Sequence, residues 1–432
     1  MKDLSVMLGN VRLKNPIISA AGPVAGTDNN IKKCADAGFG AVITKTVSWF
    51  KDFQRFPRPR YYIFDQRVTA REPHGPRPQE FSWIHLDRNS QYPPNQFAKL
   101  INESADYCAQ RDCMLIGSIS GSGIQQWEEM AVSYAEAGAK GLELNFCCPY
   151  PQTIPSRVVG NENQIGSTFG ENPDLGIPVI KRLKEVLNIP IFTKMPPTAR
   201  KQISEIAKKY KEAGADGITF YANAMAAKID IETGEPLGFG VAIGGSHGHM
   251  MDTMADVIKV AKEVPGLPIL AGRGARYWSD VIEFLMGGAA AVEFSIAIMV
   301  NGLGYVNEML ADIERWMEKK GYNSLSELQG LALSKVYKPS EIREKVKPLY
   351  AKVDGSKCIA CGRCEDVCWF DAAHLHVKNG KGAAKIIEGH CVGCTACAQV
   401  CPVAAISTYE RTDAEYLRAL VSAHPELVPD IE

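Results

Sequence analysis

Eight cysteines near the C-terminal end of the chain have the residue type and the spacing of metal ligands. They form two arrays with the same spacing, C-x2-C-x2-C-x3-C, and each member of the second array lies 33 residues after its counterpart. Three thiolates spaced in this way surround one corner of an iron–sulfur cube, and the fourth ligand comes from the other array. The predicted ligands are Cys358, Cys361, Cys364 and Cys401 for one [4Fe-4S] cluster, and Cys391, Cys394, Cys397 and Cys368 for the second.

Zinc is the alternative metal for such cysteines. Zinc sites usually take two separated C-x2-C pairs, whereas each array here has four cysteines within eleven residues, so the spacing favours clusters. The arrays resemble a bacterial-type two-cluster ferredoxin domain, with Pro402 after the last cysteine and Trp369 where the first array usually has its proline. We therefore expect a small α+β ferredoxin-like domain at residues 351–410.

Length and charge limit the class of protein. At 432 residues the chain is too long for one ordinary domain, although a single α/β barrel can take about 250 residues or more. A formal net charge of −1 leaves no positive excess for a nucleic-acid backbone. The longest apolar stretch, Gly287 to Val300, contains Glu293 and is too short to cross a bilayer. We expect neither nucleic acid nor a membrane as a partner.

The other cysteines bear on the cellular compartment. The odd number that remains outside the two arrays forms no disulfide framework, which is typical of a reducing compartment. No charged-then-apolar signal is visible at the N-terminus, so we expect a cytoplasmic protein, and exposed clusters would fit anaerobic conditions. These five cysteines are Cys34, Cys108, Cys113, Cys147 and Cys148.

Strand-length apolar runs alternate with amphipathic helical stretches through residues 1–310. Eight strands, each followed by a helical pattern, are the number that closes a (β/α)8 TIM barrel, so we predict this α/β fold. Several helix-to-strand junctions repeat one phrase, as in Ala137-Gly-Ala-Lys-Gly-Leu-Glu-Leu144, in which glycine ends the helix before a buried strand. The predicted strands are Asn15–Ala21, Ala41–Lys45, Met114–Ser118, Gly141–Asn145, Ile191–Lys194, Gly217–Phe220, Ile269–Ala271 and Ala290–Phe294.

An open doubly wound sheet is the alternative fold, but no G-x-G-x-x-G turn follows the first strand. The segment from Lys51 to Pro94 is long, aromatic and rich in proline and arginine. Such a segment either covers the functional face of a barrel, contacts a partner or is a surface excursion, and the sequence leaves these open. The predicted domains are a catalytic barrel at 1–310, a helical connector at 311–350, the ferredoxin-like domain at 351–410 and a tail at 411–432.

Polar residues and glycine turns follow the predicted strands, at the end where barrels have their active sites. Lys45 and Lys194 each end a strand, and because burying an unpaired lysine is costly, an anionic or electron-rich ligand is their natural partner. Glycine turns at 244–248 and 272–274 can bind a phosphate through backbone N–H groups. A phosphate there, with a polarised ring over Lys45, Asn145 and Lys194, describes FMN.

Together these segments resemble the flavin barrel of dihydroorotate dehydrogenases, notably Thr44-Lys45-Thr46, Glu143-Leu144-Asn145 and Gly214-Ala-Asp-Gly217. With the cluster domain, the likeness extends over residues 4–405 to the C-terminal half of dihydropyrimidine dehydrogenases and to their bacterial FMN and iron–sulfur subunits. It implies Cys148 as the general acid or base. The implied substrate contacts are Asn145, Phe146, Cys147 and Asn223, and the implied FMN contacts are Ala21, Lys45, Thr46, Asn145, Lys194, Gly248, Gly272, Arg273, Gly274, Ser295 and Ile296.

A cysteine acid suits this chemistry. Reduction of a polarised C=C bond needs hydride from the flavin on one carbon and a proton on the other, and a thiol with a pKa near about 8.5 can supply that proton near neutral pH. Cys147 and Cys148 are adjacent in a segment that we expect to be extended, so that their side chains would point in opposite directions.

The sequence departs from the pyrimidine enzymes at their substrate asparagines. Asn145 stands in place, but residues 121–125 contain no asparagine and Asn223 lies one position out of register. Each lost amide partner costs about 1 to 3 kcal/mol, so we expect a substrate preference other than uracil or thymine. Arg157, His247 and Arg273 either meet a substrate carboxylate or have structural roles.

The resulting hypothesis is an oxidoreductase that reduces or oxidises an activated C=C bond and exchanges electrons through two [4Fe-4S] clusters. No second nucleotide fingerprint occurs, so we expect electrons from a separate FAD and NAD(P)H subunit or from a ferredoxin, and a homodimer or hetero-oligomer. One alternative is an electron-transfer subunit with a non-catalytic barrel. Another is a flavin reductase acting on RNA, such as a dihydrouridine synthase.

Overall fold

The structure is a computed structural model of the 432-residue chain, and it describes residues 2–50, 60–65, 81–86, 89–148, 164–236, 242–378 and 381–424. The chain divides into two compact units, residues 1–334 and 335–432, so the division falls inside the predicted connector at 311–350. Among the described residues, no helix is long and apolar enough to cross a membrane.

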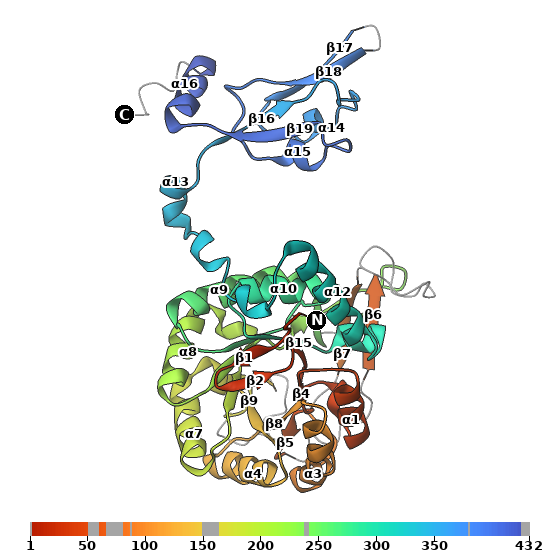
Figure 1. Ribbon diagram of the computed structural model, residues 1–432, viewed down its shortest axis with the longest axis vertical. Helices are drawn as coiled ribbons and strands as arrows, with labels where there is room; N and C mark the ends of the chain where they lie inside the picture. The colour runs from red at the N-terminus through yellow and green to blue at the C-terminus, as the bar shows by residue number, and fades with distance from the viewer. Residues whose placement is uncertain are drawn as a thin grey trace. The chain divides into compact units, whose positions relative to one another are not determined.

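The first unit is a closed barrel of eight parallel strands, as the sequence predicted (Figure 1). Pairing of β4 with β8 closes the barrel, and the two-residue strand β5 (Val47–Ser48) also pairs with β8 as a ninth strand of the same sheet. Four predicted strands agree with the structure in both bounds, and the other four differ only at their ends. In chain order the strands are β3 (Ile17–Ser19), β4 (Ala41–Ile43), β8 (Met114–Ser120), β9 (Gly141–Asn145), β10 (Ile191–Lys194), β11 (Gly217–Phe220), β14 (Ile269–Ala271) and β15 (Ala291–Phe294).

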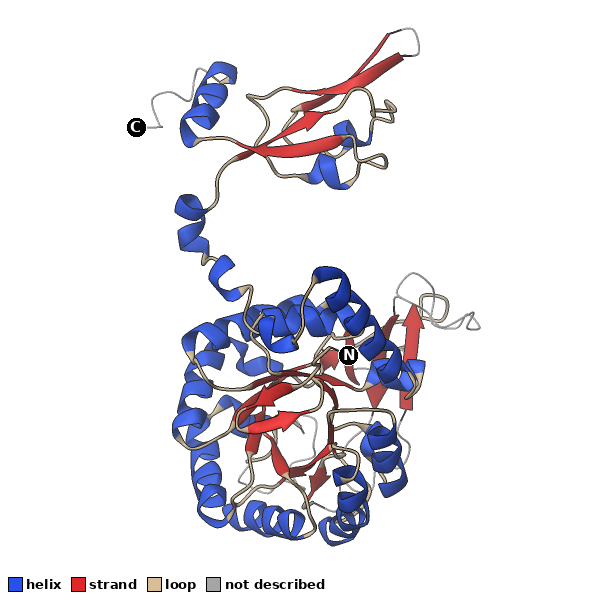
Figure 2. Cartoon of the chain, in the orientation of Figure 1, coloured by secondary structure: helices blue, strands red, loops and turns tan. Residues whose placement is uncertain are grey.

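Helices surround the barrel strands on the outside, as Figure 2 shows. Their buried faces pack on the apolar outer surface of the strands and form one continuous core. The helices are α1 (Asp28–Asp36), α3 (Pro94–Ala109), α4 (Ile124–Glu136), α7 (Pro173–Val186), α8 (Ile203–Glu212), α9 (His249–Glu263), α10 (Trp278–Met286) and α12 (Tyr305–Lys320).

The repeated junction has one backbone geometry. Gly38, Gly138, Gly214 and Gly288 follow α1, α4, α8 and α10, and all four have φ between 93° and 104°. This region of φ is open to glycine and costly for other residues. The repeated phrase in the sequence is therefore a repeated turn that directs the chain from each helix into the next strand.

A second, antiparallel sheet with the strand order β12-β13-β7-β6 belongs to the first unit. Its strands are β6 (Arg60–Asp65), β7 (Phe81–Leu86), β12 (Ala224–Ala226) and β13 (Ala242–Ser246). Two of them come from the segment between Lys51 and Pro94, for which the sequence predicted no strands. Residues 51–59, 66–80 and 87–88 of that segment lie outside the described part of the chain.

The second unit pairs β16 (Leu349–Val353) with β19 (Ile406–Glu410) and β17 (Ala373–Lys378) with β18 (Lys381–Ile386). Short helices α14 (Arg363–Asp366) and α15 (Ala396–Gln399) carry cysteines, and α16 (Asp413–Ala423) lies in the predicted tail. The core contains only small side chains besides one isoleucine: Ala351, Cys364, Ala372, Ala373, Ala384, Cys391, Cys397 and Ile406. Residues 379 and 380, between β17 and β18, lie outside the described residues.

Candidate active site

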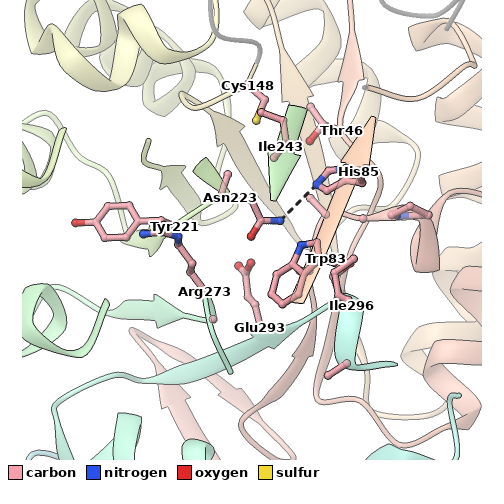
Figure 3. A pocket seen from close by; sticks show the side chains of 18 of the residues that line it. Thr46, Trp83, His85, Cys148, Tyr221, Asn223, Ile243, Arg273, Glu293 and Ile296 are labelled. Atoms are coloured by element: carbon pink, nitrogen blue, oxygen red, sulfur yellow. Dashed lines mark hydrogen bonds between the residues drawn. The ribbon is translucent and has the colours of Figure 1, made fainter. Parts of the chain in front are cut away.

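A cavity of about 510 Å³ opens at the carboxyl ends of the barrel strands (Figure 3). The ends of seven barrel strands and the loops after them form its floor and sides, and the antiparallel sheet contributes one wall. The structure brings twelve residues predicted for the site to this cavity: Ala21, Lys45, Thr46, Asn145, Cys148, Lys194, Asn223, Gly272, Arg273, Gly274, Ser295 and Ile296.

Three predicted site residues do not line the cavity: Phe146, Cys147 and Gly248. Phe146 is fully buried and packs against Trp127, Phe169 and Tyr210, with ring centroids 5.3 to 5.6 Å away. An aromatic ring in such a cluster contributes to the barrel core, so the structure gives no support to Phe146 as a substrate contact. Gly248 directly precedes α9 and stands outside the cavity wall.

The two adjacent cysteines do not diverge as the sequence led us to expect. Their sulfur atoms lie 3.7 Å apart, because the chain bends after Asn145 instead of continuing as an extended strand. The Asn145 side-chain oxygen accepts hydrogen bonds from the backbone N–H groups of Cys147 at 3.2 Å and Cys148 at 2.9 Å. The bend buries Cys147 completely, and only Cys148 reaches the cavity.

Asn145 therefore positions the cysteine loop as well as lining the cavity. Its amide nitrogen donates to Thr46 Oγ1 at 3.0 Å, and Thr46 Oγ1 in turn lies 2.8 Å from Ser118 Oγ. Both ends of the amide are thus already engaged within the protein.

Beneath the cavity is a group of buried charges. Lys194 Nζ lies 3.5 Å from Glu143 Oε1, which also accepts a hydrogen bond from Ser118 Oγ at 3.0 Å. Burial lowers the pKa of Lys194, but the carboxyls of Glu143 and Glu293 outweigh this effect, so the pKa is raised overall. The lysine is therefore a permanent cation in the floor of the cavity.

The environment of Cys148 favours its thiolate. A hydrogen bond between the two thiols lowers the pKa of Cys148, burial opposes this, and the positive charges of Lys194 and Lys45 lower it further. A thiol with a lowered pKa next to two lysines can exchange a proton near neutral pH.

Small residues let backbone groups approach a ligand at one end of the cavity. A Cβ atom at Gly274 would lie 2.3 Å from the backbone nitrogen of Met250, and one at Gly272 would lie 2.6 Å from the Glu293 carbonyl oxygen. Because neither position has room for a side chain, these turns fit the cradle that a phosphate requires. Arg273, between the two glycines, is buried and lines the cavity.

The other two candidate carboxylate contacts differ in their positions. His247 Nε2 lies 3.2 Å from Asp280 Oδ2, and His247 is absent from the cavity wall. Arg157 lies outside the described residues.

Sequence reasoning missed the wall that the antiparallel sheet provides. Tyr61 and His85 stack with ring centroids 5.2 Å apart, and Asn223 Nδ2 lies 3.5 Å from His85 Nε2. Only the aromatic composition of the Lys51–Pro94 segment signalled this wall. The lining residues from the sheet are Tyr61, Phe81, Trp83, His85, Leu86, Met225 and Ile243.

Asn89, which the sequence analysis also missed, lines the cavity together with Asn145 and Asn223. The expectation of a changed substrate preference rested on the missing asparagine in 121–125 and on the shifted position of Asn223, and it stays a prediction. The structure adds that Asn89 and Asn223 both line the cavity beside Asn145.

The cysteine arrays surround two small cavities in the second unit. Cys358, Cys361, Cys364 and Cys401 line one, and Cys368, Cys391, Cys394 and Cys397 line the other. Each set takes three cysteines from one array and the fourth from the other, which fits two interlocked clusters.

Backbone N–H groups lie at hydrogen-bonding distance from four of these sulfur atoms, and the contacts repeat with the arrays. Ala351 faces Cys391 at 3.4 Å and Ala384 faces Cys358 at 3.5 Å, while Ala372 faces Cys368 and Ala405 faces Cys401 at 3.3 and 3.2 Å. Hydrogen bonds to cluster sulfurs raise the reduction potential by stabilising the added electron.

The family described as dihydroorotate dehydrogenase matches residues 94–317, more than half of the chain. The chain belongs to the dihydroorotate dehydrogenase family. Residues 351–408 match the 4Fe-4S dicluster domain. The chain is 29% identical over 424 residues to the PreA subunit of NAD-dependent dihydropyrimidine dehydrogenase from Escherichia coli (strain K12), covering 95% of this chain and 96% of that protein.

Other members of the dihydroorotate dehydrogenase family match the barrel. The catalytic subunit of dihydroorotate dehydrogenase B (NAD(+)) from Methanothermobacter thermautotrophicus is 30% identical over 332 residues, covering 76% of this chain and 98% of that protein. The crystal structure of the Eimeria tenella dihydroorotate dehydrogenase with ferulenol superimposes with a TM-score of 0.59 at 15% identity, covering 76% of this chain and 88% of that one, which shows the shared fold.

These matches confirm the predicted class of enzyme and its cofactors. The chain is a flavin-dependent oxidoreductase of CH–CH groups, with an FMN barrel and a two-cluster [4Fe-4S] domain. The observed cavities fit these groups, because one combines a glycine cradle with lysines at strand ends and two are lined by four cysteines each.

Proposed function

We propose that the cavity holds FMN together with a small planar substrate, and that Cys148 exchanges the substrate proton. FMN, when bound, supplies or takes the hydride at one carbon of the C=C bond. In the direction of reduction, the Cys148 S–H bond breaks and its proton goes to the other carbon, which leaves a thiolate that Lys194 and Lys45 stabilise. The observation that carries this role is that Cys148 reaches the cavity and Cys147 does not.

The amide side chains in the wall support a substrate with amide or carbonyl groups. Asn89 and Asn223 line the same cavity as Cys148, and Asn89 Nδ2 has no hydrogen-bond partner among the residues that the structure describes. A buried amide donor favours ligands with a carbonyl oxygen to accept its hydrogen bond. We therefore propose a cyclic amide of the dihydropyrimidine type, which agrees with the activity named for the PreA relative.

An electron partner completes the proposal. The PreA relative is named as a subunit of an NAD-dependent enzyme, which supports a partner that handles NAD(P)H with FAD, and a ferredoxin is the alternative. A homodimer or hetero-oligomer and a cytoplasmic location also remain proposals, the latter supported by the absence of a disulfide framework.

The test compares the wild-type chain with Cys148→Ser, both prepared anaerobically with FMN and clusters. With a reduced viologen dye as the electron donor and uracil or thymine as substrate, wild type should consume the substrate. The serine variant should keep FMN and lose about 10²-fold or more in turnover. Cys108→Ala, which changes a buried cysteine outside the cavity, is the matched control and should retain turnover.

Unchanged turnover in Cys148→Ser would remove the cysteine from the mechanism. A wild-type chain that binds no flavin would instead favour the alternative, an electron-transfer subunit with a non-catalytic barrel.

A further inference from the structure

A pair of buried carboxyls at the floor of the cavity has no part in the proton transfer described above. Glu143 is on β9 and Glu293 on β15, and they are 0% and 6% exposed. Lys194, on β10 and 8% exposed, lies 3.5 Å from Glu143 Oε1, and its charge acts on both carboxyls. Two carboxyls thus share one ammonium group inside the barrel.

The charge balance of this group favours one bound proton. If both carboxyls were ionised, the barrel would hold one unneutralised negative charge, which is costly away from water. Glu143 has the contacts of the ionised partner, because it accepts hydrogen bonds from Lys194 and Ser118. Among the described residues, Glu143 Oε2 and Glu293 Oε1 both lack a hydrogen-bond partner, but only Glu143 has donors at its other oxygen. Glu293 is therefore the carboxyl that keeps the proton.

The electrostatics agree with this assignment. Burial raises the pKa of Glu293 to about 8, the negative charge of Glu143 acts in the same direction, and Lys194 opposes them. The charged groups that act on Glu293 are thus Glu143 and Lys194. Lys45, Cys148 and Arg273 also line this cavity and carry titratable or basic side chains.

We propose that Glu293 is a positioning residue for electron uptake: it shares one proton with Glu143 beside the FMN cavity and thereby keeps the floor of the cavity uncharged. Glu293 lines the same cavity as Lys194, Ala21 and Asn145, and in Figure 3 its carboxyl points toward the interior of that cavity. The inference rests on the proposed FMN site and adds a function to residues that the chemistry at Cys148 does not use.

A physical consequence follows for the reduction potential of the flavin. When Glu293 loses its proton, the floor gains one negative charge, which disfavours electrons on a nearby cofactor and lowers its reduction potential. By linkage, electrons on the cofactor raise the affinity of the carboxyl pair for its proton. The pair therefore couples electron uptake to proton uptake.

The redox test uses the FMN-loaded chain and three proteins: wild type, Glu293→Gln and Glu136→Gln. Glutamine keeps the size of Glu293 without its ionisation, and Glu136 is an exposed glutamate on α4 that serves as the control. The flavin midpoint potential is followed by its own absorbance at pH values of about 6.5 and about 9, on either side of the Glu293 transition.

The potentials of wild type and Glu293→Gln should agree at the lower pH. At the higher pH the potential of Glu293→Gln should lie above that of wild type, and Glu136→Gln should follow wild type throughout. Curves for wild type and Glu293→Gln that run parallel over the whole pH range would overturn the proposal.

A second variant should shift the pH at which the flavin potential changes slope. In Glu143→Gln, Glu293 becomes the only carboxylate partner of Lys194, so it should ionise more readily and move the break in the potential to lower pH. An unmoved break would contradict a shared proton.

The shared proton is also observable without FMN. Infrared difference spectra of wild type between neutral and alkaline pH should contain the carbonyl band of one buried carboxylic acid. That band should be absent from Glu293→Gln and present in Glu136→Gln. If the chain binds no flavin, the proposed function fails, and the presence or absence of this band still decides whether the carboxyl pair holds a proton.

Discussion

The two adjacent cysteines differ because of one bend in the chain. Asn145 Oδ1 accepts two backbone hydrogen bonds that turn the chain after β9, so Cys148 reaches the cavity and Cys147 does not. The sulfur atoms of the two cysteines lie 3.7 Å apart. Cys147 then acts through its neighbour, because the hydrogen bond between the thiols lowers the pKa of Cys148.

This contact predicts a shift in the pH profile. In the direction of reduction the thiol form of Cys148 is needed, so turnover should fall as pH rises through the pKa of Cys148. Cys147→Ala removes the hydrogen bond that stabilises the thiolate, which raises that pKa and should move the fall to higher pH. Steady-state rates over a pH series measure the shift, and a profile identical to wild type would exclude a role for Cys147.

The sequence located many site residues but not the directions of their side chains. Lys45, Asn145 and Lys194 could be found because they end buried strands, and strand ends of a barrel meet at one face. Phe146 and Glu293 could not be assigned in this way. Whether a side chain joins an aromatic cluster or shares a proton depends on partners from distant strands.

At the scale of elements, the barrel strands could be predicted from the sequence. The antiparallel sheet that forms one wall of the cavity could not. The strands β9, β10 and β11 have the predicted bounds because each is a short run of buried residues that follows a glycine turn or a proline. In contrast, β7 pairs with β13, where His85 lies opposite Ile243, and this contact joins segments far apart in the sequence. No local pattern specifies such a pairing.

Two glycines with positive φ in the cysteine loops should differ in how much their replacement by alanine destabilises the second unit. Gly393 and Gly362 have φ of 73° and 79°, but a Cβ at Gly393 would lie 2.3 Å from the Leu349 carbonyl oxygen, whereas at Gly362 the nearest atom lies 3.9 Å away. Gly362→Ala should cost about 1 to 2 kcal/mol for its backbone conformation alone. Thr395, its counterpart 33 residues later, already adopts φ of 64°.

Gly393→Ala should cost more and weaken the retention of iron, because the backbone of Leu349 must move. Iron content and thermal unfolding of the two variants, prepared side by side without oxygen, measure the difference. Equal losses in both variants would show that crowding at Leu349 is unimportant.

At the scale of the whole molecule, the two units differ in what stabilises them. The barrel has a large apolar core, whereas the core of the second unit consists of alanines, cysteines and one isoleucine around two cavities that the cysteines line. Clusters bound by those cysteines are therefore expected to supply much of the stability of residues 335–432.

Removal of iron should thus unfold the second unit and leave the barrel folded. Hydrogen exchange after anaerobic chelation should show rapid exchange in β16, β17, β18 and β19, while the barrel strands stay protected. Protection of the second unit that survives complete iron removal would mean that its small core suffices without clusters.

The account rests on one chain that joins a flavin to two iron–sulfur clusters. The most direct measurement is the amount of iron, sulfide and flavin per chain in protein purified without oxygen. Two clusters of four irons each predict eight irons, eight sulfides and one FMN. Zinc in place of iron, or a chain without a yellow chromophore, would contradict the account.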